Sequence, residues 1–113
     1  MGRLIYEGSV RFDLDDRTLA HLVVVISDKL RRAESFPLSW RNDPSTGDGR
    51  TTIWVHPASS LVFEFAGSRR PSLNRTWLEA LAIVANSPEG LHVVPEPAEE
   101  GIPEMVTEGA EPA

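Results

Sequence analysis

The stretch DDRTLAHLVVVISDKLRRAES, residues 15–35, decides the fold because its apolar side chains recur at helical spacing. Asp15 is a suitable N-cap, and Asp16 suits the positive end of a helix dipole. Lys29, Arg31 and Arg32 lie in the last turns, where cations favour the negative end of that dipole. The stretch therefore predicts a helix with one buried face. The residues expected on that face are Leu19, Leu22, Val23, Ile26, Leu30 and Ala33.

Strand patterns flank this helix on both sides. LIYEGSVRFDL, residues 4–14, predicts a hairpin whose turn is supplied by Gly8. Three further strands are predicted by the alternating segments FPLSW at 36–40, TTIWVHP at 51–57 and SLVFEFAG at 60–67. Because only the short link PASS separates the last two of these strands, they are expected to be antiparallel neighbours.

A second helix is predicted from Asn74, a suitable N-cap, to a stop near Asn86. Trp77, Leu81 and Val84 are expected to line one side of it. LHVVP, which follows, predicts a last short strand. The order ββ-α-βββ-α-β indicates an α+β fold, with a mainly antiparallel sheet and both helices packed against it.

Charge divides the chain of 113 residues into two parts. Residues 1–94 are expected to form a single α+β domain of nearly balanced charge. Residues 95–113 are rich in proline and glutamate and carry no basic or aromatic residue, which predicts a disordered acidic tail. The net charge of −6 comes from the tail glutamates. These are Glu96, Glu99, Glu100, Glu104, Glu108 and Glu111.

Two further features of composition limit the location and chemistry of the protein. The chain has no cysteine, which excludes disulfides, thiolate metal sites and cysteine nucleophiles. It also lacks an apolar run long enough for a signal peptide or for a membrane span of about 18 residues. The protein is expected to be soluble and cytoplasmic, with no membrane partner.

The glycine-rich segment STGDGR, residues 45–50, has the composition of a phosphate-binding loop but not its spacing. A Walker loop needs GxxxxGK followed by serine or threonine, and it opens a helix. Here the glycines are two residues apart, no lysine follows them, and the next element is a predicted strand. The segment and its neighbours are rich in turn-forming residues, so a long hairpin loop is predicted instead.

No catalytic residue, metal ligand or cofactor site is assigned from the sequence. His21, His56 and His92 lie on a helix and two strands without the spacing of a helical metal site, and they are interpreted as surface or half-buried structural residues. Asp15 and Asp16 are explained by capping. A GxSxG nucleophile elbow is absent.

The arginines are the candidate binding residues. If they gather on one face near an exposed tryptophan, they would suit phosphate contacts and base stacking, or a protein partner. The alternative is a solvated surface in which the arginines pair with Asp28, Glu34, Asp43, Asp48 and Glu79. The candidate residues are Arg31, Arg32, Arg41, Arg50, Arg69, Arg70, Arg75, Trp40 and Trp54.

Four segments resemble a family of small actinobacterial proteins that is a domain of unknown function: DDRTLAHLVVVISDKLRRAESFPLSW, GDGRTTIWVHP, RRPSLNRTWLEAL and GLHVVPEP. Members of this family are often named ATP-dependent DNA ligase. Ligases of that kind carry a KxDG motif, whose lysine forms a phosphoamide with AMP. Here Thr46 stands where that lysine would be needed, and the only lysine, Lys29, lies on the first predicted helix.

The function expected from the sequence is that of a small, non-enzymatic binding or adaptor domain. Its partner would be a protein or a nucleic acid bound at an arginine-bearing surface. The alternative, which follows from the family resemblance, is a ligase-related accessory or enzyme component that acts on DNA with ATP.

Overall fold

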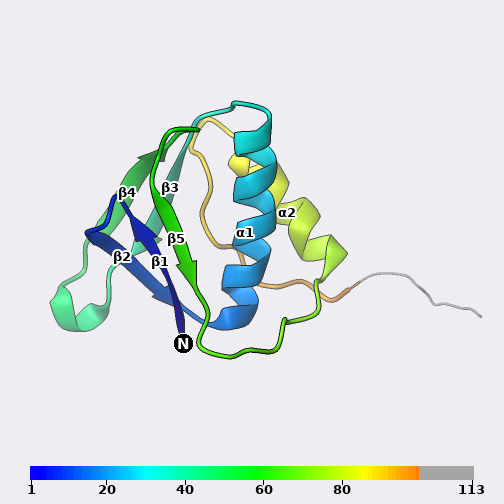
Figure 1. Cartoon of the computed structure of the whole chain (residues 1–113), viewed down its shortest axis with the longest axis horizontal. Helices are drawn as coiled ribbons and strands as arrows, with labels where there is room; N and C mark the ends of the chain where they lie inside the picture. Colours follow the sequence, from blue (N-terminus) through cyan, green and yellow to red (C-terminus); the bar gives the residue numbers. More distant parts are fainter. Residues whose placement is uncertain (100–113) are drawn as a thin grey trace, which may run out of the picture.

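The structure is a computed structural model, and it describes residues 1–99 (Figure 1). The α+β class and the predicted order of the helices and main strands are confirmed. The elements are β1 (Gly2–Tyr6), β2 (Val10–Leu14), α1 (Asp16–Arg31), β3 (Phe36–Arg41), the short 3-10 helix η1 (Pro44–Thr46), β4 (Arg50–Val55), β5 (Leu61–Glu64) and α2 (Arg75–Ala85).

The strands form two antiparallel sheets, one with the order β2-β1-β5 and the other with β3-β4. The predicted hairpin is formed by β1 and β2, and its turn residues Glu7 and Gly8 have φ values of 52° and 75°. A ring stack of Phe12 on Trp40, with centroids 4.5 Å apart, joins the two sheets. The hydroxyl of Tyr6 also donates to the carbonyl oxygen of Trp54 on β4.

The predicted pairing of β4 with β5 is wrong, because β5 pairs with β1 instead. The segment between them forms a turn in which the Ser59 amide donates to the His56 carbonyl. The next residue then binds the β1–β2 turn twice. The Glu7 amide donates to the Ser60 carbonyl at 2.9 Å, and the Ser60 amide donates to the Glu7 carboxylate at 2.8 Å. These bonds direct β5 to β1.

The predicted last strand is reduced to one parallel bridge between Leu91 and Leu38. The Leu91 amide donates to the Pro37 carbonyl, and the Leu91 carbonyl accepts from the Ser39 amide. Three residues later, the Val94 carbonyl accepts a hydrogen bond from the Trp77 indole at 2.9 Å. The chain is thereby held against α2, which explains why the strand ends after a single bridge.

Both predicted helix caps are confirmed. The Asp15 side chain accepts from the Thr18 amide, and the Asn74 side chain accepts from the Trp77 amide. The predicted stripe of α1 is correct for Leu19, Leu22 and Ile26, which are fully buried. Its last member is wrong: Ala33 lies beyond the helix, is exposed and has a φ of 59°. The predicted stripe missed four buried side chains of α1, namely Thr18, His21, Val25 and Lys29.

One apolar core connects the helices and the sheets. Leu4 of β1, Leu22 of α1, Leu38 of β3 and Leu81 of α2 are all buried in it. In Figure 1 the strands lie on one side of α1 and α2 lies on the other, and α2 also contacts β3. The face of α1 that points away from this core lies between α2 and the segment that follows β5.

The C-terminal segment contacts both helices as far as Pro97. Arg17 of α1 donates to both carboxylate oxygens of Glu96, and the Asn74 side chain donates to Glu96 and to the Pro97 carbonyl. Glu96 and Pro97 are the second and third residues of the predicted tail, so the start of that segment packs on the folded body. Residues 100–113 of the predicted tail lie outside the described residues.

Candidate functional site

Five of the seven candidate arginines line two hollows that adjoin at Val24 of α1. The first hollow lies between α1 and α2 and has a volume of about 280 Å³. The second lies between α1 and residues 65–73 and has a volume of about 460 Å³. We refer to the surface that these two hollows form as the Val24 face. Its cationic residues are Lys29, Arg31, Arg32, Arg69, Arg70 and Arg75, and its carboxylates are Asp28 and Glu79.

The Val24 face is therefore strongly basic, although the folded body as a whole is nearly neutral. The six cationic and two anionic side chains that line it give a formal charge of +4, and Glu34, which pairs with Lys29 and Arg32 at its edge, reduces this to +3. Most of the acidic residues of the chain belong to other parts of the sequence, including the C-terminal glutamates. Local charge of this kind governs which partners a surface attracts, whatever the net charge of the chain.

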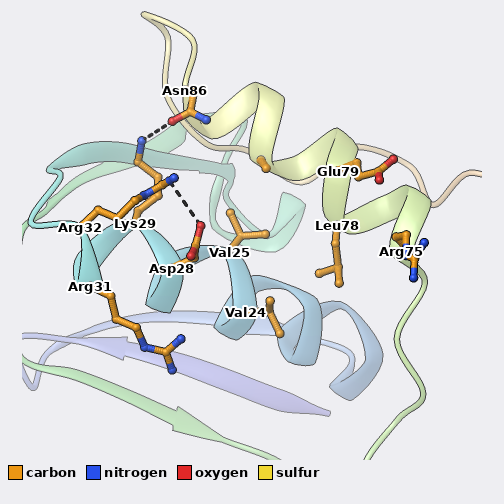
Figure 2. Close-up of a pocket in the computed structure, with 11 residues that line it drawn as sticks. Val24, Val25, Asp28, Lys29, Arg31, Arg32, Arg75, Leu78, Glu79 and Asn86 are labelled. Carbon is orange, nitrogen blue, oxygen red and sulfur yellow. Dashed lines mark hydrogen bonds and ion pairs between the residues drawn. The ribbon is translucent and has the colours of Figure 1, made fainter.

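The first hollow has an apolar floor and a charged rim (Figure 2). Val24 and Val25 of α1 and Leu78 of α2 lie between the two helices. Arg31 extends from the C-terminal end of α1, and Arg75 extends from the N-terminal end of α2. The two helices run in roughly the same direction, because the start of α1 lies beside the start of α2 and the end of α1 lies beside the end of α2. These two arginines therefore mark opposite ends of the groove.

The second hollow is built by the segment that follows β5. The Asp16 carboxylate accepts hydrogen bonds from the Ala66 and Gly67 amides at 2.9 and 2.8 Å, which ties this segment to the start of α1. The same two bonds lower the pKa of Asp16. The hollow exposes Phe65 and Leu73 beside Val24, with exposed fractions of 41%, 46% and 39%. An apolar strip thus crosses α1 between arginines.

Ion pairing on this face is incomplete. Arg32 pairs with Asp28 at 3.3 Å and with Glu34 at 3.4 Å, as the solvated-surface alternative expects. Lys29 is only 6% exposed, and its amine contacts Asn86 and Glu34. Among residues 1–99, the other four arginines of the face form no ion pair. These four are Arg31, Arg69, Arg70 and Arg75.

The remaining candidate residues lie elsewhere. Arg41 and Arg50 face each other in the β3–β4 register, at the base of the hairpin loop. Trp40 is stacked on Phe12 with an interplanar angle of 3°, so one face of its ring is already covered. Trp54 is 56% exposed and lines a third hollow near Pro37, which meets the first hollow only at Lys29 and Asn86. The predicted combination of one tryptophan with all the arginines is not formed.

A family model described as "Domain of unknown function (DUF7882)" matches residues 1–96. The chain belongs to the DUF7882 family. The matched region ends at Glu96, the residue whose side chain binds Arg17 and Asn74. No curated protein and no solved structure matches the chain. Within residues 1–99, neither helix combines the length and the apolar character needed to cross a bilayer.

The hairpin-loop interpretation of STGDGR holds for the DUF7882 chain. Asp43 caps η1 by accepting from the Ser45 amide at 2.9 Å, a bond that also lowers the pKa of Asp43. The Asn42 amide donates to the Gly49 carbonyl and closes the loop at its base. Thr46 occupies the position that a ligase motif would give to lysine. The loop and Arg41 border a hollow of about 760 Å³ that does not include the Val24 face.

The histidines have structural positions rather than a shared site. His21 is fully buried, and its Nδ1 lies 2.7 Å from the Arg17 carbonyl oxygen. Its Nε2 accepts from the Asn74 amide at 2.8 Å, so the proton of the neutral ring lies on Nδ1. Among the described residues, no three histidine or acidic side chains are arranged to hold a metal ion.

Sequence reasoning missed the polar network in which Glu96 takes part. Two bonds from Arg17 and one from Asn74 lower the pKa of Glu96 to about 2. Asn74 thus caps α2 through its side-chain oxygen and binds the C-terminal segment through its side-chain nitrogen. The sequence signal for Asn74 was its capping position, whereas Glu96 resembled the other glutamates of the predicted tail.

Proposed function

We propose that this DUF7882 domain is a cytoplasmic, non-enzymatic module that binds an acidic protein segment on its Val24 face. One observation carries this proposal. Exposed Val24, Phe65 and Leu73 are surrounded by arginines that have no ion-pair partner among residues 1–99. The bound segment would carry carboxylates at its edges and apolar side chains in its centre.

The charge of the face supports an acidic partner. Arginine binds carboxylates through two parallel hydrogen bonds, and such charge-assisted bonds are stronger than neutral ones. Arg31 and Arg75 stand at the two ends of the interhelical groove, and Arg69 and Arg70 border the second hollow. Complementary charge of this kind raises the association rate and fixes the orientation of the partner.

The apolar strip supports a partner that also has apolar side chains. Val24, Phe65 and Leu73 lie in adjoining hollows rather than scattered over the surface. A contiguous apolar patch with a polar rim is typical of protein–protein contact sites. Burial of such side chains contributes roughly 25 cal/mol for each Å² removed from water, so this strip can supply affinity that surface ion pairs do not.

A protein partner fits these residues better than a nucleic acid does. Single-stranded nucleic acids bind by stacking their bases on aromatic side chains along a basic groove. Phe65 is the only aromatic residue that lines the two hollows, because Trp40 is stacked on Phe12 and Trp54 lies beside another hollow. A phosphate backbone would also leave the apolar strip uncovered.

The ligase-related alternative rests on the family resemblance alone. Its chemistry needs an accessible lysine beside a bound nucleotide. Lys29 is the only lysine of the chain, and its amine contacts Asn86 at 2.7 Å and Glu34 at 3.2 Å. Thr46 is the residue in the motif position. We therefore propose the binding function and not the ligase function.

The proposal is tested by an NMR titration with three probes. The first is a short synthetic peptide with leucines at helical spacing and glutamates elsewhere, the second has lysine for each glutamate, and the third is single-stranded oligothymidylate. We expect the acidic peptide to shift the amide signals of Val24, Arg70 and Leu78, and the lysine peptide to leave them unchanged. Tighter binding of the oligonucleotide at this face would replace the protein proposal, and no shift with any probe would refute it.

A further inference from the structure

The acidic C-terminal sequence has the chemistry that the Val24 face would select. Residues 100–113 read EGIPEMVTEGAEPA, with four glutamates and no basic residue. Apolar residues lie between these glutamates, namely Ile102, Met105 and Val106. Carboxylates and apolar side chains thus alternate in one short segment, as the proposed partner of the face requires.

The position at which the described chain ends favours the same match. Glu96 is bound by Arg17 and by Asn74, and Asn74 directly precedes Arg75 of the Val24 face. Arg17 also donates to the Ser72 carbonyl at 2.7 Å, next to Leu73 of the face. The first glutamate of the acidic sequence is therefore already held at the border of the basic surface.

The length of the segment is sufficient for it to cover the groove. An extended chain advances by about 3.3 Å per residue, so residues 98–106 span roughly 30 Å. The eleven residues of α2 extend over only about 16 Å, because a helix rises about 1.5 Å per residue. The glutamates and apolar residues up to Val106 can thus reach both Arg75 and Arg31.

We propose that residues 100–111 bind the Val24 face of their own chain and compete there with the acidic partner. This inference rests on the proposed function of that face, and it adds an autoinhibitory segment to it. The contact is intramolecular because the segment belongs to the same chain, and the bonds of Glu96 place its start beside the face, so the effective concentration is in the millimolar range. Weak individual contacts are then enough for occupancy, and an external partner displaces the segment only when its concentration relative to its own Kd exceeds the effective concentration relative to the Kd of the segment.

The experiment uses a spin label, which the absence of native cysteine makes unambiguous. A nitroxide is attached to Thr107→Cys in the full chain, and paramagnetic broadening of amide signals is measured at low salt. We expect broadening at Val24, Arg70 and Leu78 and none at Gly47 in the hairpin loop. At about 1 M salt, where the Debye length falls to about 3 Å, the broadening should be lost. The same degree of broadening at all four residues at low salt, including none at any of them, would overturn the inference.

Two controls make the result specific. Replacement of Glu100, Glu104 and Glu108 by glutamine in the labelled chain should abolish the broadening, and its persistence would contradict the charge argument. Tenfold dilution should leave the broadening unchanged, whereas its loss would mean that the segment binds a second copy and would overturn the intramolecular proposal.

The two proposals fail in different ways. If the label leaves the face unaffected while the acidic peptide still binds there, the autoinhibitory inference is wrong and the binding function stands. If both the peptide and the label leave the face unaffected, both proposals are wrong. When both hold, the triple glutamine variant should bind the acidic peptide about tenfold more tightly than the unaltered chain does, because the competitor has been removed.

Discussion

Arg17 and Glu96 form a bidentate ion pair, with Nε 2.9 Å from Oε1 and a terminal guanidinium nitrogen 2.6 Å from Oε2. This pair joins the first turn of α1 to the last residue that the family model matches. Asn74 binds the same carboxylate and caps α2, so one side-chain network holds both helix starts and the C-terminal segment together. The acidic sequence therefore begins at a defined place beside the Val24 face.

The Arg17–Glu96 pair predicts a specific loss of stability in acid. The pKa of Glu96 is lowered from 4.5 to about 2 by the bonds from Arg17 and Asn74. Its contribution is complete above the unfolded pKa of 4.5 and is lost as the pH falls toward about 2. We expect Glu96→Gln to be less stable than the unaltered chain at neutral pH, and the difference to disappear as the pH falls below about 2. Urea unfolding at several pH values measures this.

A matched control for that experiment is Glu89→Gln, which removes an exposed carboxylate that takes part in no ion pair within residues 1–99. Its unfolding free energy should follow that of the unaltered chain at every pH. A stability difference for Glu96→Gln that stays constant from neutral pH to the acid limit would contradict the role of its carboxylate.

His21 provides a second stability prediction. It is fully buried and bonds to the Arg17 carbonyl and the Asn74 amide, while its ring packs 4.5 Å from that of Trp77. His21→Leu leaves the buried Asn74 amide without an acceptor, so we expect a loss of about 2–4 kcal/mol in unfolding free energy. His92→Gln, at an exposed position, should change it by less than about 0.5 kcal/mol. Chemical denaturation of both variants distinguishes them, and equal losses would count against the network.

Two glycines with similar backbone angles predict very different effects. Gly90 has a φ of 85°, and a Cβ there would collide with Pro37, which lies beside the Leu91 bridge. Gly8 has a φ of 75°, but its surroundings are open. We expect Gly8→Ala to cost about 1–2 kcal/mol from the backbone angle alone, and Gly90→Ala to cost clearly more. Thermal unfolding measures both, and a smaller cost at Gly90 would show that the packing against Pro37 is not restrictive.

Ligase chemistry is open to a direct assay. The Lys29 amine lies 5.5 Å from the Phe36 ring centroid and contacts Asn86 and Glu34, which leaves it poorly placed for attack on a nucleotide. After incubation with labelled ATP and Mg²⁺, we expect no covalent adenylate on the chain. Label that depends on Lys29, and is lost in Lys29→Met, would establish the ligase-related alternative.

Local chemistry explains which parts of the fold could be predicted from the sequence. Asp15 and Asn74 were predicted as caps because a cap is decided by the residues within one helical turn. The pairing of β5 with β1 was missed, because it depends on the contact of Ser60 with Glu7, which are 53 residues apart. Leu91 was placed in a strand by its apolar neighbours, whereas the Trp77 indole directs the chain after it toward α2.

The candidate site was predictable in residue type and not in arrangement. The sequence identified the arginines as candidate binding residues, but it did not show which of them share a surface. Arg69 and Arg70 come to the Val24 face because Asp16 binds the segment that carries them. Arg41 and Arg50 stay apart from it because the β3–β4 register places them at the hairpin loop.

The same division of the arginines provides the most direct test of the proposed binding function. Arg69→Ser with Arg70→Ser removes two charges from the Val24 face, and Arg41→Ser with Arg50→Ser removes two exposed arginines from elsewhere. The affinity of each double variant for the acidic leucine peptide is measured by calorimetry at low salt. We predict about tenfold weaker binding for the first variant and unchanged binding for the second. Equal affinity of the two variants, or a loss confined to the second, would contradict the assignment of the Val24 face.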